Sequence, residues 1–146
     1  MKNEESSLNE LKALVEQGAA KRWRTPSKEI ASRLEEELAV IEAVGCSAYF
    51  TCVAKLVATI RSAGGLVGPG RGVCGGSAVC YALGVTGVDP IKHGLLFERF
   101  LHRGLKQPRS ILIDVDEVGE KVGRGYLEDR FACKYEETYY PLEWNR

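Results

Sequence analysis

The chain has 146 residues, with 20 basic and 20 acidic side chains, so its formal net charge at pH 7 is zero. A chain of this length buries roughly 68 to 70% of the surface of its unfolded state, which is enough for one autonomous core. The neutral balance argues against a free-standing protein that binds nucleic acid through a globally basic surface.

Residues 1–64 are predicted to be mainly helical. Apolar residues recur at helical spacing in residues 8–15. Thr25 with Pro26 at the first helical position predicts a longer helix that ends before Gly45. A third helix is expected over 48–62. The apolar stripes of these helices are expected to form core.

Residues 68–77 read Gly-Pro-Gly-Arg-Gly-Val-Cys-Gly-Gly-Ser, and they lie between a short predicted strand at 66–67 and a predicted helix at 78–83. Glycines adopt positive φ readily and turn successive N–H groups toward an anion, and a helix N-terminus also favours negative charge. Arg71 adds a forked cation. The pattern favours a phosphate cradle, although a tight structural turn is the commoner explanation of a glycine-rich turn alone.

The run Ile111-Leu112-Ile113-Asp114-Val115-Asp116 is predicted to be a central strand that leads into a helix at 117–131. Because side chains alternate along a strand, Asp114 and Asp116 should share one face while Ile113 and Val115 point into the core. Paired carboxylates repel each other unless a cation lies between them, and Mg²⁺ prefers such oxygen ligands. For an arbitrary Asp-x-Asp, however, a solvated strand end is the commoner outcome. A further helix is expected over 95–101, after the break at Asp89-Pro90.

The five cysteines are odd in number and lack CxxC spacing, and the sequence contains neither a signal peptide nor an 18-residue apolar span. These features predict a cytoplasmic protein with reduced thiols and no membrane partner. Basic strips at 21–24 and around 102–109 could contact a phosphate backbone, although exposed charge runs are usually only solvated.

Several motifs together resemble one known family. They are Val67-Gly68-Pro69-Gly70-Arg71-Gly72, Gly76-Ser77, Tyr81-Ala82-Leu83-Gly84-Val85-Thr86, Val88-Asp89-Pro90 and Leu95-Leu96-Phe97-Glu98-Arg99-Phe100-Leu101. In this order they resemble the palm of the bacterial DNA polymerase III alpha subunit, the C-family replicative polymerase. The resemblance runs from about Leu8 to Phe131.

The resemblance implies an α/β (α+β) fold, a single palm-like domain over 1–146. A mixed β-sheet with packed helices, of the DNA polymerase beta-like nucleotidyltransferase type, would follow the helical front end. The glycine-loop core would be 65–131, and 132–146 would be an aromatic tail. The implied reaction is nucleotidyl transfer on DNA. Asp114 and Asp116 would be catalytic and hold Mg²⁺, and the deoxynucleoside triphosphate would be bound by Gly70, Arg71, Gly72, Gly75, Gly76 and Ser77.

The chain departs from the family pattern in ways that matter for activity. Val73 stands where the family usually has Ser, so one hydroxyl that could reach a phosphate is missing. The family's third catalytic carboxylate, thumb and fingers are not matched. A fragment that is inactive alone is therefore expected, and a non-catalytic palm-derived binding or interaction module is the alternative. A homodimer or a complementary subunit would cover the face that the missing parts leave.

Overall fold

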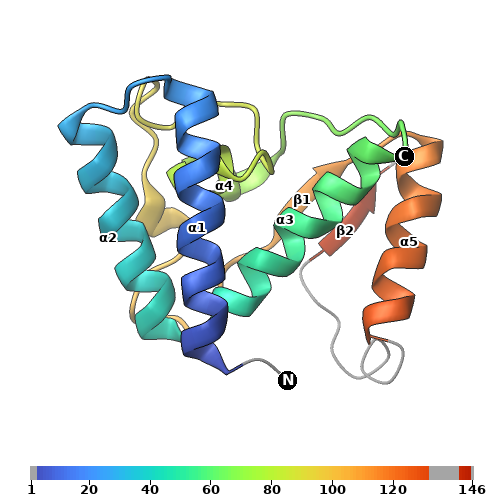
Figure 1. The fold of residues 1–146 in the computed structure, drawn as a ribbon, viewed down its shortest axis with the longest axis horizontal. Helices are drawn as coiled ribbons and strands as arrows, with labels where there is room; N and C mark the ends of the chain where they lie inside the picture. Colours follow the sequence, from blue (N-terminus) through green and yellow to red (C-terminus); the bar gives the residue numbers. More distant parts are fainter. Residues whose placement is uncertain (1–2, 132–141, 146) are drawn as a thin grey trace.

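The computed structural model describes residues 3–131 and 142–145, and these residues form a mainly helical molecule with one short pair of strands (Figure 1). The elements are α1 (Glu4–Trp23), α2 (Lys28–Val44), α3 (Ser47–Ser62), the 3-10 turn η1 (Gly72–Gly76), α4 (Ala78–Ala82), the 3-10 turn η2 (Phe97–Arg99), β1 (Ile111–Asp114), α5 (Glu117–Phe131) and β2 (Leu142–Asn145).

The predicted helical front end is confirmed, and local capping sets its boundaries. The side chain of Asn3 accepts a hydrogen bond from the Ser6 amide at the start of α1. Ser27 caps α2 in the same way, so this helix begins after Pro26 and not at it, which corrects the predicted start. At the other end, Gly45 has φ +76°, the left-handed conformation in which glycine commonly ends helices.

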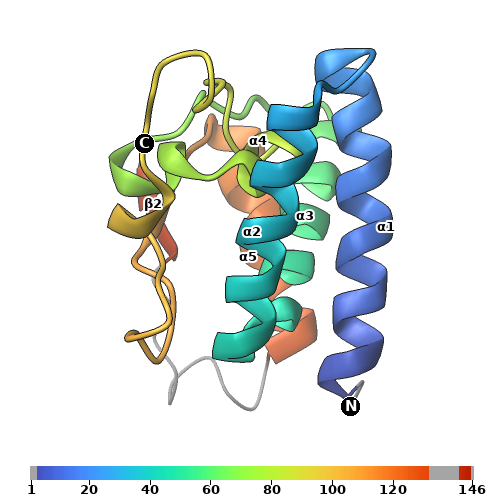
Figure 2. The same cartoon turned by 90° about the vertical axis from the view of Figure 1, so that its left-hand side faces the viewer.

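Helix α3 forms the centre of the core. It packs against α1 on one side and against α5 on the other, while the short helix α4 lies against α1 and α2 (Figures 1 and 2). Phe50, Leu56 and Ile60 of α3 are fully buried, as are Phe100 and Ile111 from later segments. The front end is therefore a packed scaffold for the segments that follow it.

The sheet is smaller than predicted. Strand β1 pairs in parallel with β2, with Ile111 opposite Leu142 and Asp114 opposite Asn145. The segment before η1 adds only isolated antiparallel bridges, from Val67 to Val115 and from Arg71 to Leu112. In that segment Pro69 has no N–H to donate, and Gly70 has φ +93°, so a continuous third strand does not form. The described residues are rich in helix and do not define a polymerase palm.

The predicted helix at 95–101 is wrong. Gly94 has φ +64° and Leu96 has extended backbone angles, so only a 3-10 turn, η2, follows. The apolar residues of this stretch still enter the core, since Phe97, Phe100 and Leu101 are buried. Most of the predicted aromatic tail at 132–146 lies outside the described residues.

None of the described helices is by itself long and apolar enough to cross a membrane. Helices α2 and α3 pass that test of length and composition only as a pair, and they are bent by 117° where they join.

Candidate functional site

The alternation predicted for residues 111–116 is confirmed. Ile111, Ile113 and Val115 are buried, while Asp114 and Asp116 are partly exposed on the opposite face. Asp114 is the last residue of β1 and Asp116 lies two residues further along the chain, and both side chains are at least partly outside the core.

Arg71 lies beside the first of these carboxylates. Its Nη2 is 2.8 Å from Asp114 Oδ1, and the two side chains are 49% and 39% exposed. The backbone is held at the same place, because the Gly68 amide donates to the Asp114 carbonyl oxygen at 2.8 Å. An ion pair this exposed is worth about 0 to 1 kcal/mol, so a competing ligand can displace it at small cost.

Asp116 caps α5. Its Oδ1 accepts hydrogen bonds from the Gly119 amide at 2.8 Å and from the Leu66 amide at 3.1 Å. The recorded hydrogen bonds of Asp114 and Asp116 with the described residues all use Oδ1. The Oδ2 atoms are therefore the oxygens through which these carboxylates can take a further ligand.

The N-terminus of α4, where the sequence predicts an anion, holds a carboxylate of the chain itself. Glu37 of α2 accepts hydrogen bonds from the amides of Ala78 at 2.8 Å and Val79 at 2.9 Å, and from the Ser77 hydroxyl at 2.9 Å. Ser77 is fully buried and Glu37 is 1% exposed. The buried carboxylate thus fills the place that a phosphate would take.

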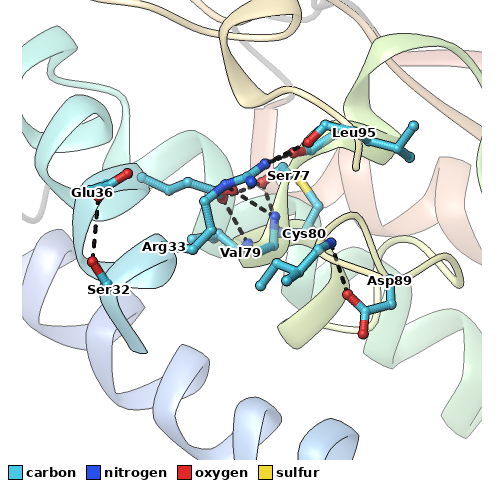
Figure 3. A network of polar contacts seen from close by, with 12 residues as sticks. Ser32, Arg33, Glu36, Ser77, Val79, Cys80, Asp89 and Leu95 are labelled. Atoms are coloured by element: carbon cyan, nitrogen blue, oxygen red, sulfur yellow. Dashed lines mark hydrogen bonds and ion pairs between the residues drawn. The ribbon is translucent and has the colours of Figure 1, made fainter. Parts of the chain in front are cut away.

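Arg33 holds this arrangement from the outer side. Its Nε is 2.8 Å from Glu37 Oε1, and its Nη2 donates to the carbonyl oxygens of Gly76 at 2.7 Å and Leu95 at 3.0 Å (Figure 3). Burial raises the pKa of Glu37 above its ordinary value, while the hydrogen bonds from Val79 and Ala78, the Arg33 charge and the Ser77 hydroxyl oppose the shift.

Glycine occupies the different positions of the loop for different structural reasons. Gly70 and Gly72 have φ of +93° and +74°, which side chains rarely adopt. Gly76 packs so closely that an added Cβ would lie 2.4 Å from the Leu96 carbonyl oxygen, whereas a Cβ at Gly75 would meet nothing within 4 Å. Backbone shape and packing alone therefore account for three of these four glycines.

The structure divides the predicted nucleotide-binding residues into two groups. Arg71 lies with the Asp pair, while Ser77 and Gly76 face Glu37 and Arg33 of α2. Among the described residues no group of three or more His, Cys, Asp or Glu side chains is arranged to hold a metal ion. The nucleotide and metal roles of these residues stay predictions, and the geometry favours Arg71 over Ser77.

Glu37 is not among the site residues predicted from the sequence. It belongs to the acidic run Glu35-Glu36-Glu37, which looks like an exposed charged face. Its position supplied a signal, however, because it lies three residues after Leu34 and four before Ile41, both buried on the same face of α2. A charged residue on an apolar stripe needs an internal partner.

Comparison with known proteins establishes the family. Residues 9–138 match the family model described as the bacterial DNA polymerase III alpha NTPase domain. The chain belongs to this family. The coarser part of the predicted resemblance, to DNA polymerase III alpha, is thereby confirmed, whereas the match does not by itself assign the segment to the palm.

Several relatives support the same assignment. The chain is 50% identical over 115 residues, 78% of its length, to the DNA polymerase III subunit alpha of Halalkalibacterium halodurans, and the match covers 10% of that protein. It is 38% identical over 130 residues, 87% of its length, to the error-prone DNA polymerase of Anaeromyxobacter sp. strain K, covering 11%. Against the DNA polymerase III subunit alpha of Streptococcus pyogenes serotype M3 the identity is 38% over 134 residues, 90% of the chain and 13% of the relative. The chain thus spans about a tenth of the length of these relatives.

Proposed function

We propose that this chain is the part of a DNA polymerase III alpha palm that binds the incoming deoxynucleoside triphosphate with Mg²⁺, as a step in nucleotidyl transfer on DNA. Family membership supports the general role. The observation that carries the specific site is the ion pair between Arg71 and Asp114 at 2.8 Å, with the partly exposed Asp116 two residues further along the chain.

The residues present fit a magnesium ion that arrives with its nucleotide. Mg²⁺ is usually bound by one or two carboxylates together with substrate phosphates and water. The hydrogen bonds that Asp114 and Asp116 form with the described residues all use Oδ1, so each Oδ2 can coordinate an ion. The ion would neutralise charge on the triphosphate and on the reacting oxygens. Asp114 and Asp116 would hold it, and Arg71 would turn from Asp114 to a phosphate oxygen.

We do not expect this chain to catalyse nucleotidyl transfer by itself. Asp114 and Asp116 would hold a nucleotide-bound ion, but the resemblance places the family's third carboxylate outside the matched segment. We expect nucleotide binding without templated DNA synthesis.

Two observations favour the alternative of a non-catalytic, palm-derived binding module. Glu37 occupies the helix N-terminus at Ser77, and Val73 offers no hydroxyl to a phosphate. A triphosphate could then be bound only by the side of the loop that carries Arg71. The two functions differ in whether Mg²⁺ and nucleotide bind at all.

Isothermal titration calorimetry with Mg²⁺ and each deoxynucleoside triphosphate separates them. We expect Mg²⁺-dependent binding that weakens roughly tenfold or more in Asp114→Asn and in Asp116→Asn, since each loses a charged ligand. Asn keeps the shape of both side chains, and at position 116 it also keeps the cap of α5. Glu128→Gln, an exposed acid elsewhere on α5, is the matched control. Absence of heat with every nucleotide would support the binding module instead.

A further inference from the structure

A basic cleft lies between α1, α3 and the end of α4, formed by residues other than the Asp pair and the glycine loop. It has a volume of about 690 Å³. Small residues of α1 and α3, among them Gly18, Ala54 and Ala58, are part of its lining. At Gly18 the lack of a side chain lets α4 approach closely, because a Cβ there would lie 1.8 Å from the Ala82 carbonyl oxygen. Its lining also includes Lys21, Arg22, Lys55 and Arg61, and the described residues that line it include no Asp or Glu.

Three of these four cations have no carboxylate partner recorded among the described residues. Lys55 forms an ion pair with Glu10. The side chain of Lys21 forms no hydrogen bond or ion pair with the described residues, and the side-chain hydrogen bonds of Arg22 and Arg61 go to main-chain oxygens. The cleft therefore concentrates positive charge in a chain whose net charge is zero.

The two arginines are fixed in place. Arg22 donates from Nε to the Tyr81 carbonyl oxygen and from Nη2 to that of Thr86, both at 2.9 Å. Its guanidinium also lies 4.3 Å from the centre of the Tyr81 ring. Arg61 donates from Nη1 to the Gly84 carbonyl oxygen at 2.6 Å. Because a guanidinium has five N–H donors, each arginine keeps donors for a ligand after these bonds are made.

The positive charges of Arg61 and Arg22 also disfavour each other. Burial lowers the pKa of Arg61, and the nearby charge of Arg22 lowers it further. Two like charges held by carbonyl oxygens and not by acids are relieved by a bound anion. A planar guanidinium matches the oxygens of a phosphate group.

We propose that this cleft binds phosphate groups through Lys21, Arg22 and Arg61. The backbone of a nucleic acid and a free oligophosphate present the same chemistry, and the cleft does not distinguish them by charge alone. Because its ligands are cations, binding requires no metal ion. The proposed site is thus separable from the magnesium-dependent site at Asp114 and Asp116.

The test uses the full chain in EDTA, so that no metal-dependent binding contributes. Sodium triphosphate is titrated by calorimetry, and a fluorescein-labelled single-stranded oligothymidylate is titrated by anisotropy at several salt concentrations. We expect binding of at least one probe, weakened roughly tenfold or more in the double variant Lys21→Gln with Arg61→Gln. For the oligonucleotide, the logarithmic salt slope should fall by about 0.7 for each phosphate that the variant no longer neutralises.

Arg24→Gln is the matched control, because it removes the same charge from the same basic strip but Arg24 does not line the cleft. Lys21→Gln alone is the second variant, since it disturbs no recorded hydrogen bond or ion pair of the described residues, and thermal melting checks that each variant is folded. Tight binding of triphosphate alone assigns the site to a free oligophosphate, and binding of the oligonucleotide assigns it to the nucleic-acid backbone. The proposal is overturned if neither probe binds in EDTA, or if Arg24→Gln weakens binding as much as Lys21→Gln does.

Discussion

The carboxylate of Glu37 accepts hydrogen bonds from the first amides of α4. The first amides of a helix have no partner within it, and here those of Ala78 and Val79 are buried with no access to water. Glu37 accepts from both, and Arg33 balances its charge. Removing one member of such a buried group leaves the others unpaired, which costs several kcal/mol in other proteins.

The pKa of Glu37 predicts a pH dependence of stability. Burial raises this pKa above the ordinary value of 4.5, so between the two values the folded state binds more protons than the unfolded state. The contribution of Glu37 to the free energy of unfolding is therefore full below pH 4.5 and falls as pH rises through the folded-state pKa. We expect this component in urea unfolding curves of the wild type and not in those of Glu37→Gln.

Glu36→Gln is the control for this comparison. Glu36 is the exposed neighbour of Glu37 on α2, so this substitution changes the same chemical group outside the core. It should keep the pH dependence of the wild type. The interpretation fails if Glu37→Gln and Glu36→Gln give parallel curves.

At the scale of elements, α4 depends on the front end for both of its termini. It is only five residues long, too short to be stable alone. Glu37 of α2 holds its first amides, and Arg22 of α1 with Arg61 of α3 hold the carbonyl oxygens at and beyond its end. Opposite charges thus complement the two ends of the helix, and the glycine loop is fixed because α4 is fixed.

Two adjacent glycines of the loop should respond differently to substitution. Gly76→Ala pushes a methyl group into the backbone at Leu96, and we expect a loss of roughly 1 to 3 kcal/mol in the free energy of unfolding. Gly75→Ala faces open space and should change it by less than about 0.5 kcal/mol. Equal losses from the two variants, measured by urea unfolding, would show that the contact with Leu96 does not constrain the loop.

We expect the cap of α5 to contribute to the stability of the folded protein. Asp116→Ala removes the acceptor for the Gly119 amide and should lower the free energy of unfolding by about 1 kcal/mol. Asp116→Asn keeps an acceptor and should remain within about 0.5 kcal/mol of the wild type, as urea unfolding would measure. Should Asp116→Asn prove as unstable as Asp116→Ala, the negative charge and not the cap would be the stabilising feature.

For the molecule as a whole, local signals in the sequence predicted the long helices and the face shared by Asp114 and Asp116. Gly45 ended α2 as expected, and α5 has the predicted span. What could not be predicted depends on long-range partners. The stretch at 95–101 is apolar enough for a helix, but Gly94 turns the chain and Arg33 holds Leu95 from another element. The same holds for Glu37, whose role depends on amides about 40 residues away.

The two proposed sites lie on different parts of this scaffold. The Asp pair leaves the strand beside Arg71, whereas the basic cleft lies between the long helices. We propose that a metal-bound nucleotide binds at the Asp pair and not at the N-terminus of α4.

The most direct test is paramagnetic broadening of backbone amide NMR signals by Mn²⁺, which takes the same oxygen ligands as Mg²⁺, in the presence of a deoxynucleoside triphosphate. We predict that the signals of Arg71 and of residues 114–117 broaden first and that this broadening disappears in Asp114→Asn. Earlier broadening at Ala78 and Val79, or broadening that is unchanged in Asp114→Asn, would show that the metal-bound nucleotide does not bind at the Asp pair.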